Sequence, residues 1–173
     1  MSNGIIIYGT SVAIQTTPGT NALIVSGGNT LATFIYGSMS GDNINTTIAI
    51  SDSAVYYPVT GLSTGAVNGF TYATSVLTAV YAGKYKVDWS ISFHIASGAG
   101  KNIEGEVMIN TTAQDNTSAH RLIGTGTDTG NMGGTGIITL AVDDTVKLSV
   151  KNTTDTVDVV VDHANISLVR VGA

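Results

Sequence analysis

The chain has 173 residues, of which 11% are charged, and a formal net charge of −5, with only seven lysines and arginines. So few basic residues argue against a protein that binds the phosphate backbone of nucleic acid. Val, Ile and Thr number 60, whereas Leu, Met, Gln, Glu, Lys and Arg together number 23, and because β-branched residues favour strands, a mostly helical fold is excluded.

The first 52 residues predict short strands separated by turns, with Ile5, Ile6, Ile7 and Tyr8 forming the first apolar run. Asp42 and Asp52 are the only charged residues before Lys84. Polar residues interrupt the apolar ones too often for a membrane span, and no basic residue precedes the first run as in a signal peptide. We therefore expect a protein made in the cytoplasm without a signal peptide. A surface with so few charges is expected to be covered by a partner or by further copies.

The clearest strand lies at residues 84–95, where apolar and polar side chains alternate without interruption and Trp89 falls on the apolar face. A long flexible connection is predicted over the glycine-rich residues 124–134. Further strands are expected at residues 103–110, 136–142, 145–151, 157–161 and 164–168. Strands at this spacing, separated by Gly, Asn and Asp turns, indicate an antiparallel sandwich or barrel.

Residues that could carry chemistry are few, and we predict no enzyme and no cofactor. Cysteine is absent, and no serine lies in a nucleophile elbow. The histidines His94, His120 and His163 are expected to be solvated or at an interface, with His120 in a loop. Asp162 and His163 are adjacent in a strand and cannot pair directly.

No metal site is predicted with a clear motif, but three carboxylates are weak candidate ligands for calcium: Asp155, Asp158 and Asp162. Asp158 and Asp162 lie about 13 Å apart on one strand face, at ~3.3 Å per residue. One ion cannot be shared over that distance within a chain, although copies around a symmetry axis could converge on it. The alternative is a carboxylate face that keeps an outer strand soluble.

Three segments resemble the tumour-necrosis-factor and complement-globular-head superfamily. They are VYAGKYKVDWSISF at 80–93, GIITLAVDDTVKL at 136–148 and the closing ANISLVRV at 164–171. The segment EVMIN at 106–110 occupies the place of a further family strand, with Thr111 where the family has glycine. Asp143 also stands where glycine is common, which leaves the geometry of that turn open.

The resemblance implies an all-β fold, an antiparallel jelly-roll β-sandwich of about ten strands that assembles as a homotrimer. It covers residues 53–173, and residues 1–52 are then a short β-rich anchoring and assembly segment. The alternative is that residues 1–52 supply the first strands of the same domain. The family's last strand lies near the threefold axis, which implies a trimer interface at Ala164, Ile166 and Leu168.

The domain looks most like those attached to bacteriophage virion proteins. This resemblance implies a non-enzymatic virion structural protein, a trimeric capsid decoration or head-fibre protein on the particle surface. Its partners would be itself and, through Ile5, Ile6, Ile7 and Tyr8, the major capsid protein or another virion protein. The alternative is a tail-fibre or tail-tip domain that recognises a host-surface glycan or protein. Neither nucleic acid nor a membrane is an expected partner.

Overall fold

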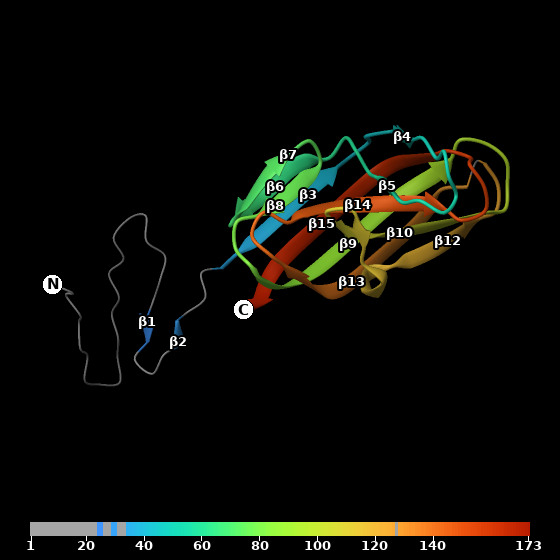
Figure 1. Cartoon of the computed structure of the whole chain (residues 1–173). Helices are drawn as coiled ribbons and strands as arrows, with labels where there is room; N and C mark the ends of the chain where they lie inside the picture. Colours follow the sequence, from blue (N-terminus) through green and yellow to red (C-terminus); the bar gives the residue numbers. More distant parts are fainter. Residues whose placement is uncertain (1–23, 26–28, 31–33, 127) are drawn as a thin grey trace. The chain divides into compact units, whose positions relative to one another are not determined.

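The computed structural model describes residues 24–25, 29–30, 34–126 and 128–173, which fall into two compact units. In the unit Met1–Thr33, β1 (Ile24–Val25) pairs antiparallel with β2 (Asn29–Thr30). The run from Ile5 to Tyr8 that the sequence nominated for anchoring lies outside the described residues. The unit Phe34–Ala173 is a sandwich of two antiparallel sheets (Figure 1).

The first sheet has the order β13-β9-β15-β3-β6, and β4 also pairs with β15. The long strands β9 and β15 run side by side through its centre (Figure 1). Its strands are β3 (Tyr36–Gly41), β4 (Thr46–Ile48), β6 (Ser63–Asn68), β9 (Gly83–Ile95), β13 (Gly130–Leu140) and β15 (Val159–Gly172).

The second sheet has the order β11-β10-β14-β8-β7, with β12 on β10 and β5 on β14. A 3-10 turn, η1 (Asp115–Thr117), connects β11 to β12 and is the helical element of the described residues. None of the described residues forms a helix that is long and apolar enough to cross a bilayer. The strands are β5 (Tyr57–Pro58), β7 (Phe70–Ala73), β8 (Val76–Ala79), β10 (Lys101–Ile109), β11 (Thr112–Ala113), β12 (Ala119–Ile123) and β14 (Thr145–Asn152).

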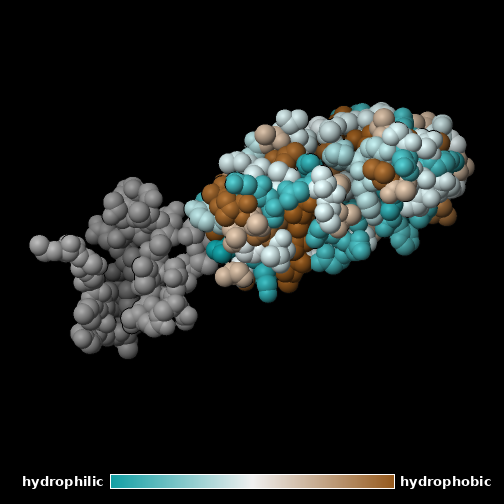
Figure 2. All heavy atoms as spheres, in the orientation of Figure 1, coloured by the Kyte–Doolittle hydropathy of each residue, from teal (hydrophilic) through white to brown (hydrophobic). Residues whose placement is uncertain are grey.

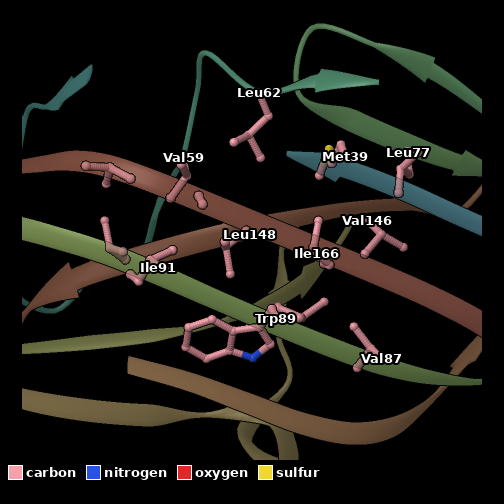
Figure 3. Close-up of a cluster of buried hydrophobic side chains, with 14 of the residues drawn as sticks. Met39, Val59, Leu62, Leu77, Val87, Trp89, Ile91, Val146, Leu148 and Ile166 are labelled. Atoms are coloured by element: carbon pink, nitrogen blue, oxygen red, sulfur yellow. The ribbon is translucent and has the colours of Figure 1, made fainter. Parts of the chain in front are cut away.

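The core lies between the two sheets and is filled by the inward residues of alternating strands (Figure 3). The alternation predicted for residues 84–95 is confirmed, because every odd-numbered residue of β9 is buried. Trp89 is 3% exposed, and its indole N–H donates a hydrogen bond to the carbonyl oxygen of Thr117 at 2.9 Å. Buried indole N–H groups need such a partner, so η1 completes the core at this point.

The glycine-rich run predicted as a flexible connection is in part a strand, since β13 begins at Gly130 and pairs with β9 along its whole length. Glycine is required where the chain passes over Trp89. A Cβ atom at Gly134 would overlap Thr117 O and approach the indole nitrogen to 2.7 Å, and one at Gly105 would lie 2.8 Å from the indole ring. The glycines therefore make room for the tryptophan.

The free side of β13 lies against η1. The Asn116 side-chain amide donates to Ile137 O at 2.9 Å. A Cβ atom at Gly136 would lie 2.9 Å from Asn116 O, so the two backbones approach closely. A side chain therefore satisfies a backbone acceptor on the edge of the first sheet.

The two closing strands that the sequence predicts, 157–161 and 164–168, form one strand, β15. Its pairing with β9 shifts register between Val161 and His163, so Asp162 is the extra residue of a β-bulge. Before the bulge the odd-numbered residues are buried, and after it the even-numbered ones are. Because the alternation of buried and exposed residues shifts by one position at the bulge, the sequence pattern of this single strand resembles two separate strands.

Residues 34–52 belong to the sandwich, in keeping with the alternative that the N-terminal residues supply strands of the same domain. β3 pairs with β15 along Tyr36–Gly41, and β4 pairs with it at Val159 to Val161. Met39 and Ile48 lie in the core. The compact unit starts at Phe34 rather than at Ser53, the boundary placed from the family resemblance.

The turn between β13 and β14 has the backbone conformation that glycine favours, although it contains Asp143. Asp143 has a φ of 68°, in the left-handed region. The neighbouring Asp144 accepts hydrogen bonds from Ala141 N at 2.7 Å and from the Asn110 side chain at 2.8 Å. The turn therefore has the left-handed backbone that glycine favours, with an aspartate in that position.

Replacing Asp143 with glycine is expected to raise the free energy of unfolding by up to about 1 kcal/mol. The left-handed conformation costs a non-glycine residue roughly 1–2 kcal/mol, more than the roughly 0.5–1 kcal/mol of added chain entropy for glycine. Urea unfolding measures the change. The matched control, Asp144→Gly, should destabilise because it removes two hydrogen-bond acceptors. Equal losses in both variants would contradict the account.

Candidate self-association surface

The outward face of the first sheet is the candidate site. The residues facing away from the core on its central strands are half-buried or exposed. We call them the outer face. They are Lys84, Lys86, Asp88, Ser90, Ser92 and His94 on β9, Asn165, Ser167, Val169 and Val171 on β15, Asn131, Gly133, Thr135, Ile137 and Thr139 on β13, and Tyr36, Ser38 and Ser40 on β3.

One end of the outer face carries several exposed apolar residues, beside Lys84 and Lys86. The register aligns Ile137, Lys86, Val169 and Tyr36 in a row across four strands. Ile137 is 58% exposed, Val169 47% and Tyr36 38%. Two further exposed apolar residues lie next to this row along the chain: Val171 in β15, and Phe34, which precedes β3. Figure 2 shows hydrophobic atoms at the surface where β15 ends. We call Phe34, Tyr36, Ile137, Val169 and Val171 the apolar patch.

The one charged residue within the aligned row does not break the apolar patch. The Lys86 ammonium forms an ion pair with Asp88 on the same strand. Hydrogen bonds from Lys86, and next from Thr135, lower the pKa of Asp88. The charge is therefore directed toward the middle of the sheet, while the lysine methylenes can cover apolar neighbours.

Apart from Asp88, the middle of the outer face consists of short, uncharged side chains. Neighbouring strands are joined there by hydrogen bonds from Asn165 to Ser90 at 2.8 Å and from Asn131 to Ser92 at 3.1 Å. Such cross-strand pairs hold the side chains flat against the sheet. A flat surface with few charges can be covered by another chain at little desolvation cost.

The far end of the outer face holds two histidine–carboxylate pairs. His94 Nδ1 lies 3.1 Å from Asp162 Oδ2, and His163 Nδ1 lies 2.7 Å from Asp42 Oδ1. The expectation that Asp162 and His163 do not pair with each other agrees with these contacts. His94 is on the polar face of its strand as predicted, while His120 lies in β12 rather than in a loop.

The three calcium nominees are not brought together. Asp155 pairs with Lys101, whose hydrogen bond lowers the pKa of that carboxyl. Asp158 accepts a hydrogen bond from Ile50 N at 2.9 Å, and Asp162 pairs with His94. The described residues contain no cluster of three His, Asp or Glu side chains that could hold a metal ion.

The residues that the resemblance implied for the trimer interface point into the core of the sandwich and not outward. Ala164, Ile166 and Leu168 are at most 3% exposed within a single chain, because they point between the two sheets. A side chain in the protomer core cannot also contact another protomer. The intervening residues of β15, among them Asn165, Ser167 and Val169, are the ones that face outward.

No family model matches the sequence, and neither does any curated protein. Among solved structures, Eiger TNF from S. frugiperda superposes with a TM-score of 0.59 at 14% identity, over 80% of this chain and 93% of that chain. The chain has a TNF-like and complement-like jelly-roll fold.

Two further structures agree. The globular domain of zebrafish complement 1qA gives a TM-score of 0.54 at 13% identity, over 80% of this chain and 98% of the other. Murine APRIL at pH 5.0 gives 0.53 at 10% identity, over 79% and 99%. The jelly roll expected from the sequence resemblance is therefore confirmed, and at these identities the likeness is one of fold.

Proposed function

We propose that this jelly roll is a non-enzymatic structural protein that assembles as a homotrimer through the outer face of its first sheet. The observation that carries this proposal is the apolar patch, which continues into a flat surface of short uncharged side chains. Contiguous exposed apolar residues on a soluble domain mark an interaction site. A closed symmetric assembly covers such a face on every copy.

We further propose that the trimer decorates a bacteriophage particle, as a capsid decoration or head-fibre protein attached through the N-terminal residues. The low charge of residues 1–33 and the sequence resemblance to virion-attached domains support this role. A tail-fibre domain that binds a host glycan is less well supported, because Trp89, the single tryptophan of the chain, lies in the core and not where a sugar could stack on it.

Two histidines of the outer face are held by carboxylates. His94 is paired with Asp162, and His163 with Asp42. These pairs connect neighbouring strands, β9 with β15 and β15 with the residue after β3. In the proposed structural role, these pairs stabilise the packing of neighbouring strands.

A chain shortened to residues 34–173 is expected to fold and to form trimers, but not to bind particles that lack the protein. The unit that starts at Phe34 contains both complete sheets. Circular dichroism, light scattering and co-sedimentation with depleted particles measure the three properties. Retained particle binding would overturn the anchoring role.

The comparison chain begins at Ser53 and lacks β3 and β4. It loses the buried Met39, Ile48 and Ile50 and leaves one side of β15 unpaired. Unlike the 34–173 chain, it should fail to give soluble, cooperatively folded protein. A stable fold from residue 53 onward would contradict the assignment of residues 34–52 to the sandwich.

A further inference from the structure

A buried acid lies on the second sheet, away from the self-association surface. Glu106 is on β10, where Ile103, Gly105 and Val107 face the core and Glu106 faces outward. Its side chain is nevertheless only 1% exposed. One of its carboxyl oxygens, Oε1, is buried without a hydrogen-bond partner within the described part of the chain. Burying an ionised carboxylate without full hydrogen bonding is costly.

Glu106 lies beside a segment that we call the strap. The strap is residues 49–58, and it comprises the connection that follows β4 together with β5. Tyr57 and Pro58 pair with Val150 and Ser149 of β14. Tyr56 therefore lies level with Lys151, the next residue of β14. The Lys151 ammonium is 4.2 Å from the centre of the Tyr56 ring. A cation at this distance from an aromatic ring is attracted to it, which holds Tyr56 over the sheet.

The same lysine neutralises a second acid beside the first. Lys151 Nζ lies 3.1 Å from Glu104 Oε2, and the two residues are register partners on β14 and β10. After burial, the charges of Glu106 and Glu104 and their action as hydrogen-bond acceptors raise the pKa of the Tyr56 hydroxyl, which therefore lies close to both carboxyls. One hydroxyl has one proton and can donate to only one carboxylate at a time. Two ionised carboxylates therefore cannot both be satisfied by Tyr56.

A proton on Glu106 removes this conflict. Glu106 can then donate to the Tyr56 oxygen, and Tyr56 can donate to Glu104, whose charge Lys151 balances. Burial raises the pKa of Glu106, and the negative charges of Asp115 and Glu104 raise it further, while the Tyr56 hydrogen bond and Lys151 act in the opposite direction. His120 lies opposite Glu104 on β12, and Lys147 lies two residues from Ser149, the register partner of Glu106, on the same face of β14 as Lys151.

We propose that Glu106 is a proton switch for the strap: its protonated form holds Tyr56 on the second sheet, and its ionisation releases residues 51–57. The ends of the strap stay attached. Ile50 N donates to Asp158 at 2.9 Å, and Val59 N donates to Leu148 O at 2.8 Å. Between them, the strap is paired with the sheet by the two residues of β5 alone.

The direction of the pH effect follows from the chemistry. An acid whose pKa is higher in the folded protein stabilises the closed strap below its ordinary pKa. That contribution is lost as the pH rises through the raised value. The strap should therefore be most strongly protected in mild acid and least protected in base.

Hydrogen exchange of the full-length chain tests the switch. Amides of residues 51–57 would be followed from about pH 4.5 to about pH 9, corrected for intrinsic exchange rates, with β9 as the internal reference. We expect the protection of the strap relative to β9 to fall, by at most about tenfold per pH unit, as the pH rises from the ordinary pKa of a glutamate to the raised pKa of Glu106, and to level off above it. In Glu106→Gln, which cannot ionise, protection should stay constant.

The matched control is Asp158→Asn, which changes a carboxylate to an amide at the other end of the strap but keeps an acceptor for Ile50 N. It should retain the pH dependence of the unmodified chain. Two results would overturn the proposal. One is strap protection in the unmodified chain that follows β9 at every pH. The other is an unchanged pH dependence in Glu106→Gln.

Discussion

Replacing Trp89 with alanine is expected to lower the free energy of unfolding by about 3–5 kcal/mol. Trp89 is buried where β9, β10, β13 and η1 meet, and it is the register partner of Ile166 (Figure 3). Its removal leaves a cavity that the glycines at 105 and 134 cannot fill. It also leaves Thr117 O without its donor. Urea denaturation followed by circular dichroism measures the loss.

The comparison variant is Trp89→Phe, which keeps an aromatic ring but has no N–H group. Its cost should be smaller, about 1–3 kcal/mol, because most of the apolar surface stays buried while one buried acceptor loses its partner. An alanine variant as stable as the unmodified chain would show that Trp89 does not support the core.

Replacing Val169 with aspartate is expected to separate the assembly without unfolding the chain. Val169 is 47% exposed and lies at the centre of the apolar patch, between Lys86 and Tyr36. A carboxylate there would have to be desolvated in the assembly, and the neighbouring Lys86 is already paired with Asp88. In light scattering, the mass should fall from about 53 kDa for a closed trimer to the 17.7 kDa of one chain.

The control is Leu122→Asp, which makes the same change at an exposed apolar residue of the second sheet. Leu122 is 62% exposed on β12, so the variant should keep the mass of the unmodified chain. Ile166→Asp is not a useful test of assembly, because Ile166 is in the core and its substitution would unfold the sandwich. An unmodified chain that is monomeric at every concentration would contradict the trimer.

Much of the fold could be predicted because single strands carry their own pattern. Residues 84–95 alternate strictly, and β9 has the predicted buried face. The prediction was less accurate where the pattern depends on another part of the chain. β13 is glycine-rich because it passes over Trp89, a contact that its own sequence does not reveal. β15 changes parity at a bulge, and bulges have no fixed sequence signature.

The candidate surface was harder to predict than the fold. The family resemblance pointed to a strand of the candidate surface, β15, but the residues that it implied for the interface face the core. The signal for the outward face was present in Val169 and Val171, which are apolar where Asn165 and Ser167 are polar. Their alignment with Ile137 and Tyr36 depends on the pairing of four strands that are distant in the sequence. The burial of Glu106 was equally hidden, because Tyr56 covers it from another segment.

The contact between Asn116 and the edge of β13 bears on how copies can add to one another. A free edge strand invites another chain to extend the sheet through backbone hydrogen bonds, and such addition can continue without limit into a fibre. Here the Ile137 carbonyl already has a donor, and η1 lies against Gly136. Growth by sheet extension is blocked at this position, which favours association by faces and an assembly with a fixed number of chains.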